Sequence, residues 1–110
     1  MHSFDHLVPS KSVRLVQCWI DELDAKVVIS PPRQTKLGDF RVNNNNLIIT
    51  INQNLNPYSF LITLTHEIAH AFIWKNYKNR VKPHGEEWKE VYMRLMLNFL
   101  NPDIFPQDIL

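Results

Sequence analysis

The sequence predicts a small α+β protein in which one helix, a three-stranded sheet and two further helices follow one another. Three observations support this class. Apolar residues recur at helical spacing near both ends, short β-branched segments lie between them, and an asparagine run separates two of those segments. The 110 residues are 45% hydrophobic, as in a globular protein. We expect a single domain over residues 1–110, with its core at about residues 9–100.

The first helix begins near Pro9-Ser10, and its inward face has apolar residues every three or four positions. These residues are Val13, Val16, Ile20 and Leu23. Cys18 lies on this helix beside Trp19, and we expect it to pack into the core. It is the only cysteine, which excludes an internal disulfide and suits a protein of the reducing cytoplasm.

Three strands are predicted next, at Lys26–Ser30, Leu37–Val42 and Leu47–Asn52. The last two form a hairpin, and the run Asn43–Asn46 is its turn, because asparagine tolerates the left-handed backbone that tight turns require. A polar binding loop is the alternative interpretation of that run. No apolar run approaches the roughly 20 residues of a membrane span, so we expect no membrane partner.

A longer helix begins at Asn56-Pro57, where asparagine can cap and proline suits the first turn. It contains the motif HExxH, with His66 and His70 four residues apart. Because a helix advances about 100° per residue, the two imidazoles lie on one face and can bind one metal ion. The helix also has an apolar face, formed by Phe60, Leu61, Leu64, Ile68, Ala71 and Phe72.

Glu67 lies about 100° round from His66, beside such a metal rather than on it. There it could hold and deprotonate a water on the metal, as the glutamate of zinc peptidases does. The alternative is that the two histidines are ordinary surface residues of an amphipathic helix.

A catalytic zinc site needs a third protein ligand, and two residues are candidates. His84 stands before a last helix predicted from Gly85 to about Leu100, whereas Glu90 lies within that helix. Both side chains suit zinc, but the position of His84 at the helix mouth favours it. The inward residues of that helix are Trp88, Val91, Tyr92, Leu95 and Phe99.

The segments HEIAHAF and HGEEW, with Leu37-Gly38-Asp39-Phe40-Arg41 upstream, resemble the SprT-like metalloprotease domain. The resemblance implies a minimal zincin-like fold, Zn²⁺ bound by His66, His70 and His84, and Glu67 as catalytic base. It also implies peptide-bond hydrolysis. The related Spartan-type proteases degrade proteins covalently trapped on DNA. Many relatives carry a four-cysteine zinc ribbon that this chain lacks, so the functions of that ribbon do not carry over.

The segment between His70 and His84 is basic and contains no acidic residue. Its cations are Lys75, Lys78, Arg80 and Lys82, in a chain whose net charge is only +1. Both ends of the segment adjoin expected metal ligands, so these charges should lie near the cleft and favour a polyanion such as DNA. An ordinary solvated loop is the alternative. The remaining histidines, His2 and His6, are expected in a mobile tail.

The sequence therefore predicts a zinc-dependent endopeptidase that acts on proteins or peptides, with DNA as a further candidate partner. A donor to the oxyanion is also expected, and Tyr77, Tyr92 and Arg41 are the candidates. The rival interpretation is a nucleic-acid-associated binding module with zinc in a structural role. The intact Glu67 and the three-ligand site argue against that rival.

Overall fold

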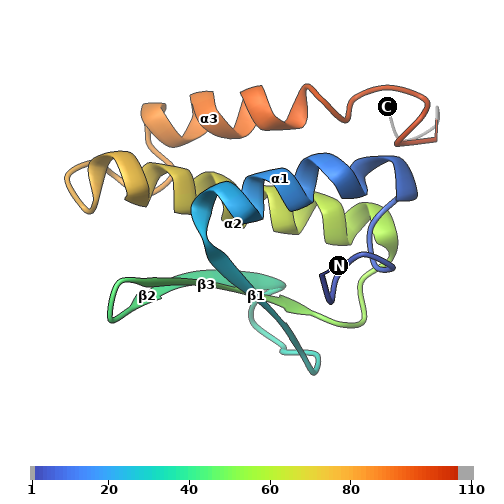
Figure 1. Cartoon of the computed structure of the whole chain (residues 1–110), viewed down its shortest axis with the longest axis horizontal. Coiled ribbons are helices and arrows are strands. Elements are labelled where there is room, and N and C mark those ends of the chain that lie inside the picture. The colour runs from blue at the N-terminus through green and yellow to red at the C-terminus, as the bar shows by residue number, and fades with distance from the viewer. Residues whose placement is uncertain (1, 107–110) are drawn as a thin grey trace.

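A computed structural model describes residues 2–106 and has the α+β order expected from the sequence (Figure 1). Its helices are α1 (Val13–Leu23), α2 (Pro57–Tyr77) and α3 (Glu86–Met96), and a short 3₁₀ turn (Ser10–Ser12) leads into α1. Its strands are β1 (Ala25–Ser30), β2 (Gly38–Asn43) and β3 (Asn46–Asn52). The three helices lie on one side of the sheet, and α2 contacts the sheet, α1 and α3.

The sheet has the order β1-β3-β2, with β3 parallel to β1 and antiparallel to β2. The predicted hairpin turn is confirmed, because Asn44 and Asn45 have φ angles of 53° and 68° in a two-residue connection. Among residues 2–106, β2 is therefore an edge strand, and no other strand pairs with its outer side. This edge lies on the side of the molecule where α2 and α3 are joined (Figure 1).

The α2 helix begins at the predicted cap, where the Asn56 side chain accepts a hydrogen bond of 2.9 Å from the Ser59 backbone N–H. It is buried on two sides, because it packs on the sheet below and on α3 above. For this reason Ile73, three residues after His70 along the helix, is buried like most of the apolar face. The two-sided burial fixes the axis of the helix that bears His66 and His70.

Several expectations outside the site were wrong. Cys18 is exposed rather than packed in the core. It lies two residues from each of the buried residues Val16 and Ile20, and therefore on the opposite side of α1 from them. The segment from His2 onward is no mobile tail, since Phe4 is fully buried and His2 stacks on it and pairs with Asp21 at 3.1 Å.

The core also extends past the expected end at residue 100, to Ile104 and Phe105. The last helix stops at Met96 rather than near Leu100, although Phe99 beyond its end is buried as expected. Across residues 2–106 no helix is long and apolar enough to span a membrane.

Candidate metal centre

Three histidine side chains converge between α2 and the loop that leads into α3. The Nε2 atom of His84 lies 3.0 Å from Nε2 of His66 and 2.9 Å from Nε2 of His70. His66 and His70 are held one helical turn apart on α2, as the motif spacing predicts. His84 reaches them from the loop with a positive φ of 58°, an uncommon conformation that aims its ring back at the helix.

This arrangement suits a single metal ion. Candidate ligand atoms of all three histidines lie within 4.8 Å of one another. Two nitrogens bound to one tetrahedral zinc at about 2.0–2.1 Å would be about 3.3 Å apart, so the observed separations need only a small adjustment. Glu90 is not part of the group, because its carboxylate is exposed and accepts a hydrogen bond of 2.9 Å from Arg94.

The surroundings keep the helical histidines uncharged. Burial, and then the positive charge that His84 can carry, lower the pKa of His66. The same two causes, with a smaller contribution from His66, lower the pKa of His70 to about 4. An imidazole must be unprotonated to bind a metal, so at neutral pH both rings are in the form that a ligand requires.

Glu67 lies beside the histidines but outside their group. It is only 7% exposed, and burial raises the pKa of its carboxyl to about 7, with a further contribution from the negative charge of Asp39. The positive charges of Arg33 and Lys36 act to lower the pKa of Glu67, but they do not outweigh burial. Such a carboxyl exchanges a proton near neutral pH, which is the property of a general base.

Glu67 and the three histidines line one open cleft of about 450 Å³. The opposite wall of this cleft is the start of β2, formed by Gly38, Asp39 and Phe40, and Pro83 completes the lining. The loop before β2 supports that wall from the outer face of the sheet, where the Arg33 guanidinium donates to the Asp39 carboxylate and to the Asn52 side chain. The cleft thus joins a proton acceptor, three nitrogen ligands and a strand edge.

Trp88 also belongs to the site, although the sequence analysis gives it no role there and places it only on the inward face of the last helix and in the HGEEW segment. Its ring lies 4.7 Å from those of His66 and His84 and 5.2 Å from that of His70, measured between centroids. Its indole N–H also points at the His66 carbonyl, at 3.4 Å. The signal in the sequence is its position four residues after His84, in the first turn of α3.

The three candidate oxyanion donors lie in different places. Tyr92 stacks on Trp88 at 4.9 Å with the rings 9° from parallel, and its ring centroid is 5.7 Å from that of His66. Arg41 instead binds Asp39 and Thr50 on the sheet, and Tyr77 is partly exposed at the end of α2. Of these three, Tyr92 is the one whose ring packs against the histidine cluster.

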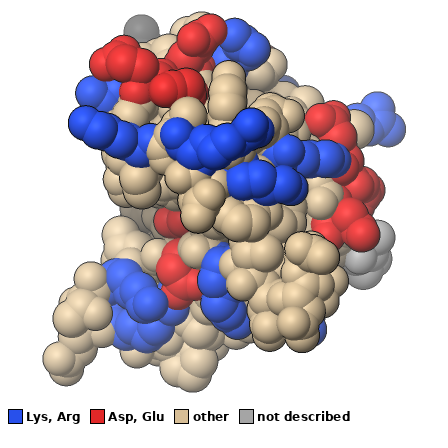
Figure 2. All heavy atoms as spheres, turned by 90° about the vertical axis from the view of Figure 1, so that its left-hand side faces the viewer, with Lys and Arg blue, Asp and Glu red and all other residues tan. Residues whose placement is uncertain are grey.

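The four cations of the basic loop are exposed, and basic side chains form a band above a hollow with acidic side chains in it (Figure 2). Lys78 lies 5.6 Å from the centre of the Trp74 ring, and Lys78 and Lys82 both line a cavity that His70 also lines. Lys75 donates to the Glu22 carbonyl of α1, and Arg80 donates to the Tyr77 carbonyl. Lys78 and Lys82 therefore lie close to His70, at the wall of one cavity.

Fold and site together define a small α+β domain whose three clustered histidines could hold a metal ion. The model of the SprT-like family matches residues 13–104, and the chain belongs to this family. No curated protein and no solved structure gave a match.

Proposed function

We propose that the chain is a zinc-dependent endopeptidase with a minimal zincin-like fold. One observation carries the proposal: the ring nitrogens of His66, His70 and His84 meet in the same cleft that Glu67 lines. The SprT-like family membership, which is associated with metallopeptidases, supports the same activity.

In this proposal the three histidines hold Zn²⁺. Bound there, zinc would polarise the scissile carbonyl and make a water acidic enough to act as a nucleophile near neutral pH. Glu67 accepts the proton of that water and passes it to the leaving amine, because its carboxyl lines the same cleft as the three histidines. Trp88 keeps the imidazoles in place by packing against all three, and Tyr92 is the best-placed donor to the oxyanion.

The substrate would lie as an extended peptide along β2. Residues Gly38 to Phe40 of this edge strand form the wall opposite the histidines and Glu67. A peptide that pairs with a free strand edge forms main-chain hydrogen bonds, and these do not depend on its sequence. The scissile bond would then lie between the strand and α2, within reach of Glu67.

The competing function is a binding module with zinc in a structural role. A structural zinc is normally enclosed by four protein ligands, whereas here three histidines open onto a cleft of about 450 Å³. A structural site also gives no reason to bury Glu67 beside the metal ligands, because an ionised carboxylate is costly to bury.

We include DNA-associated proteins among the proposed substrates, acted on in the cytoplasm. Lys78 and Lys82 stand beside the cleft, so a polyanion bound to the basic segment would bring its attached protein close to Glu67. Trp74 and Tyr77 lie in the same region and could stack on bases.

The test uses purified protein, a chelator and a denatured protein substrate. The protein should bind one zinc per chain, lose hydrolysis in chelator and regain it with zinc. Glu67→Gln should retain zinc but hydrolyse at least about a hundredfold more slowly. Full zinc binding with no hydrolysis in the wild type, with or without single-stranded DNA, would favour the binding module.

A further inference from the structure

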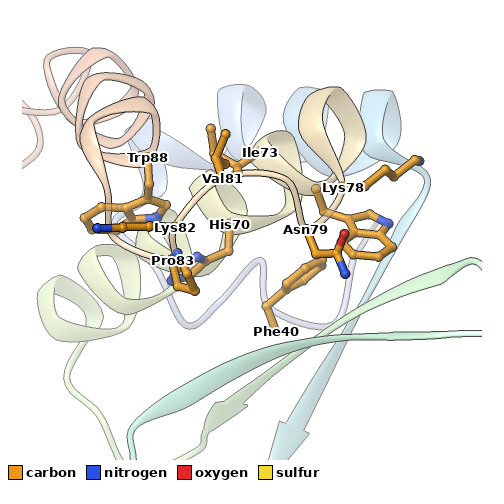
Figure 3. A pocket seen from close by; sticks show the side chains of 10 residues that line it. Phe40, His70, Ile73, Lys78, Asn79, Val81, Lys82, Pro83 and Trp88 are labelled. Carbon is orange, nitrogen blue, oxygen red and sulfur yellow. The ribbon is translucent and has the colours of Figure 1, made fainter.

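A second cavity adjoins the cleft on the side of the α2–α3 loop (Figure 3). It has a volume of about 220 Å³ and shares Phe40, His70 and Pro83 with the cleft. Phe40 rises from β2 toward the loop, and His70 and Ile73 come from α2 (Figure 3). The remaining apolar walls are Trp74, Val81 and Trp88.

The size and chemistry of this cavity fit one amino-acid side chain. Pockets for drug-sized ligands are typically about 300–1,000 Å³, so 220 Å³ is too small for one. Its walls are mostly aromatic and aliphatic, which favours a bulky apolar group. The polar groups among its walls include the exposed Lys78 and Lys82, which disfavour a basic side chain by repulsion.

The direction of β2 decides which part of a substrate meets the cavity. Gly38 borders the end of the cleft beside Ile62, Thr63 and Glu67, and Phe40 borders the end that opens into the cavity. A peptide paired antiparallel with β2, the slightly more stable pairing, runs from the Phe40 end to the Gly38 end. Its residues at the cavity therefore precede the bond that lies beside Glu67.

We propose that this cavity is a specificity subsite, which receives one bulky apolar side chain from the amino-terminal side of the scissile bond. The inference rests on the proposed peptidase function for the position of the scissile bond. The cavity itself, and its preference for an apolar side chain, follow from the lining alone.

Binding is measured first, without catalysis, on the zinc-loaded Glu67→Gln variant. The probes are fluorescein-labelled, alanine-rich peptides that differ at one position, which is Phe, Leu, Ala or Lys, and the readout is anisotropy. The Phe and Leu peptides should bind about tenfold more tightly than the Ala peptide, and the Lys peptide should bind no better than the Ala peptide. Equal binding of all four would overturn the subsite, whether or not the wild type hydrolyses any peptide.

Two variants place the preference in this cavity. Val81→Trp should fill the cavity, and Asn79→Trp adds an indole at an exposed position of its lining, where the larger side chain need not be buried. Both should reduce the Phe-to-Ala ratio to near one while zinc content stays at the wild-type level. Leu97→Trp, at an exposed position directly after the end of α3, is the matched control and should leave the ratio unchanged. A full Phe preference in Asn79→Trp would overturn the assignment.

Mass spectrometry of the products formed by the wild type tests the direction. The Phe peptide should be cut on the carboxyl side of the phenylalanine. A cut on its amino side would overturn the antiparallel placement. If no peptide is cut although the Phe preference in binding is present, the apolar cavity stands and the proposed peptidase function fails.

Discussion

The buried carboxyl of Glu67 should make the stability of the metal-free protein fall as pH rises. Its pKa is raised from 4.5 to about 7, chiefly by burial, so between these values the folded protein binds a proton that the unfolded chain has lost. The free energy of unfolding therefore includes a contribution that is complete below pH 4.5 and is lost as pH rises through 7. A tenfold change in proton affinity is worth about 1.4 kcal/mol, so the loss approaches about 3 kcal/mol.

Glu67→Gln removes this titration and keeps the shape of the side chain. The assay is urea unfolding of chelator-treated wild type and variant, followed by tryptophan fluorescence from pH 4 to pH 8. The variant's free energy of unfolding minus that of the wild type should rise with pH by about 3 kcal/mol. The lowered pKa values of His66 and His70 have the opposite pH dependence, but they occur in both proteins and cancel in the difference.

Glu90→Gln is the matched control, because it removes a carboxylate that is exposed to solvent rather than buried. Its free-energy difference from the wild type should change little with pH. A Glu67→Gln difference that stays constant within about 0.5 kcal/mol over this range would refute the reasoning. It would mean that water solvates the Glu67 carboxylate in the cleft, and that its pKa is not raised.

Three further predictions concern ligands, packing and charge. His84→Ala should lose most of its zinc by elemental analysis and Glu90→Ala should keep it, and the reverse result would make Glu90 the third ligand. Gly38→Ala should lower the free energy of unfolding by about 1–3 kcal/mol, since the added methyl would lie 2.8 Å from Ile51 and Thr63 side-chain carbons, whereas the exposed Leu37→Ala should cost less. Wild-type binding to single-stranded DNA should weaken with salt at a log–log slope of about −3, and Lys78→Glu with Arg80→Glu should abolish it; no binding at low salt would leave the segment an ordinary loop.

The parts of the fold that depend on local sequence were predictable. Asn56 caps α2 and the pair Asn44 and Asn45 turns the hairpin, because each acts through its own side chain or its tolerance of positive φ. The i, i+4 spacing of His66 and His70 likewise needs only helical geometry. In each case the relevant contact spans a few residues.

The parts that depend on distant packing were not predictable. Cys18 and Trp19 adjoin on α1, and only the position of the other elements makes Trp19 half-buried against Phe99 and Cys18 exposed. The burial of Phe4 and Phe105 requires that the segments around these two residues pack against the core, which no local pattern encodes. The parallel pairing of β1 with β3 is a similar long-range choice.

The site shows why its third histidine comes from outside α2. A helix offers ligands only at fixed steps along one face, so a third nitrogen within about 3 Å of Nε2 of His70 must arrive from another direction. His84 arrives with a left-handed backbone, which has an energetic cost for a residue with a side chain. The packing of Trp88 against all three rings stabilises that conformation. The geometry thus depends on an aromatic side chain of α3, so Trp88→Ala should weaken zinc binding although Trp88 supplies no ligand atom.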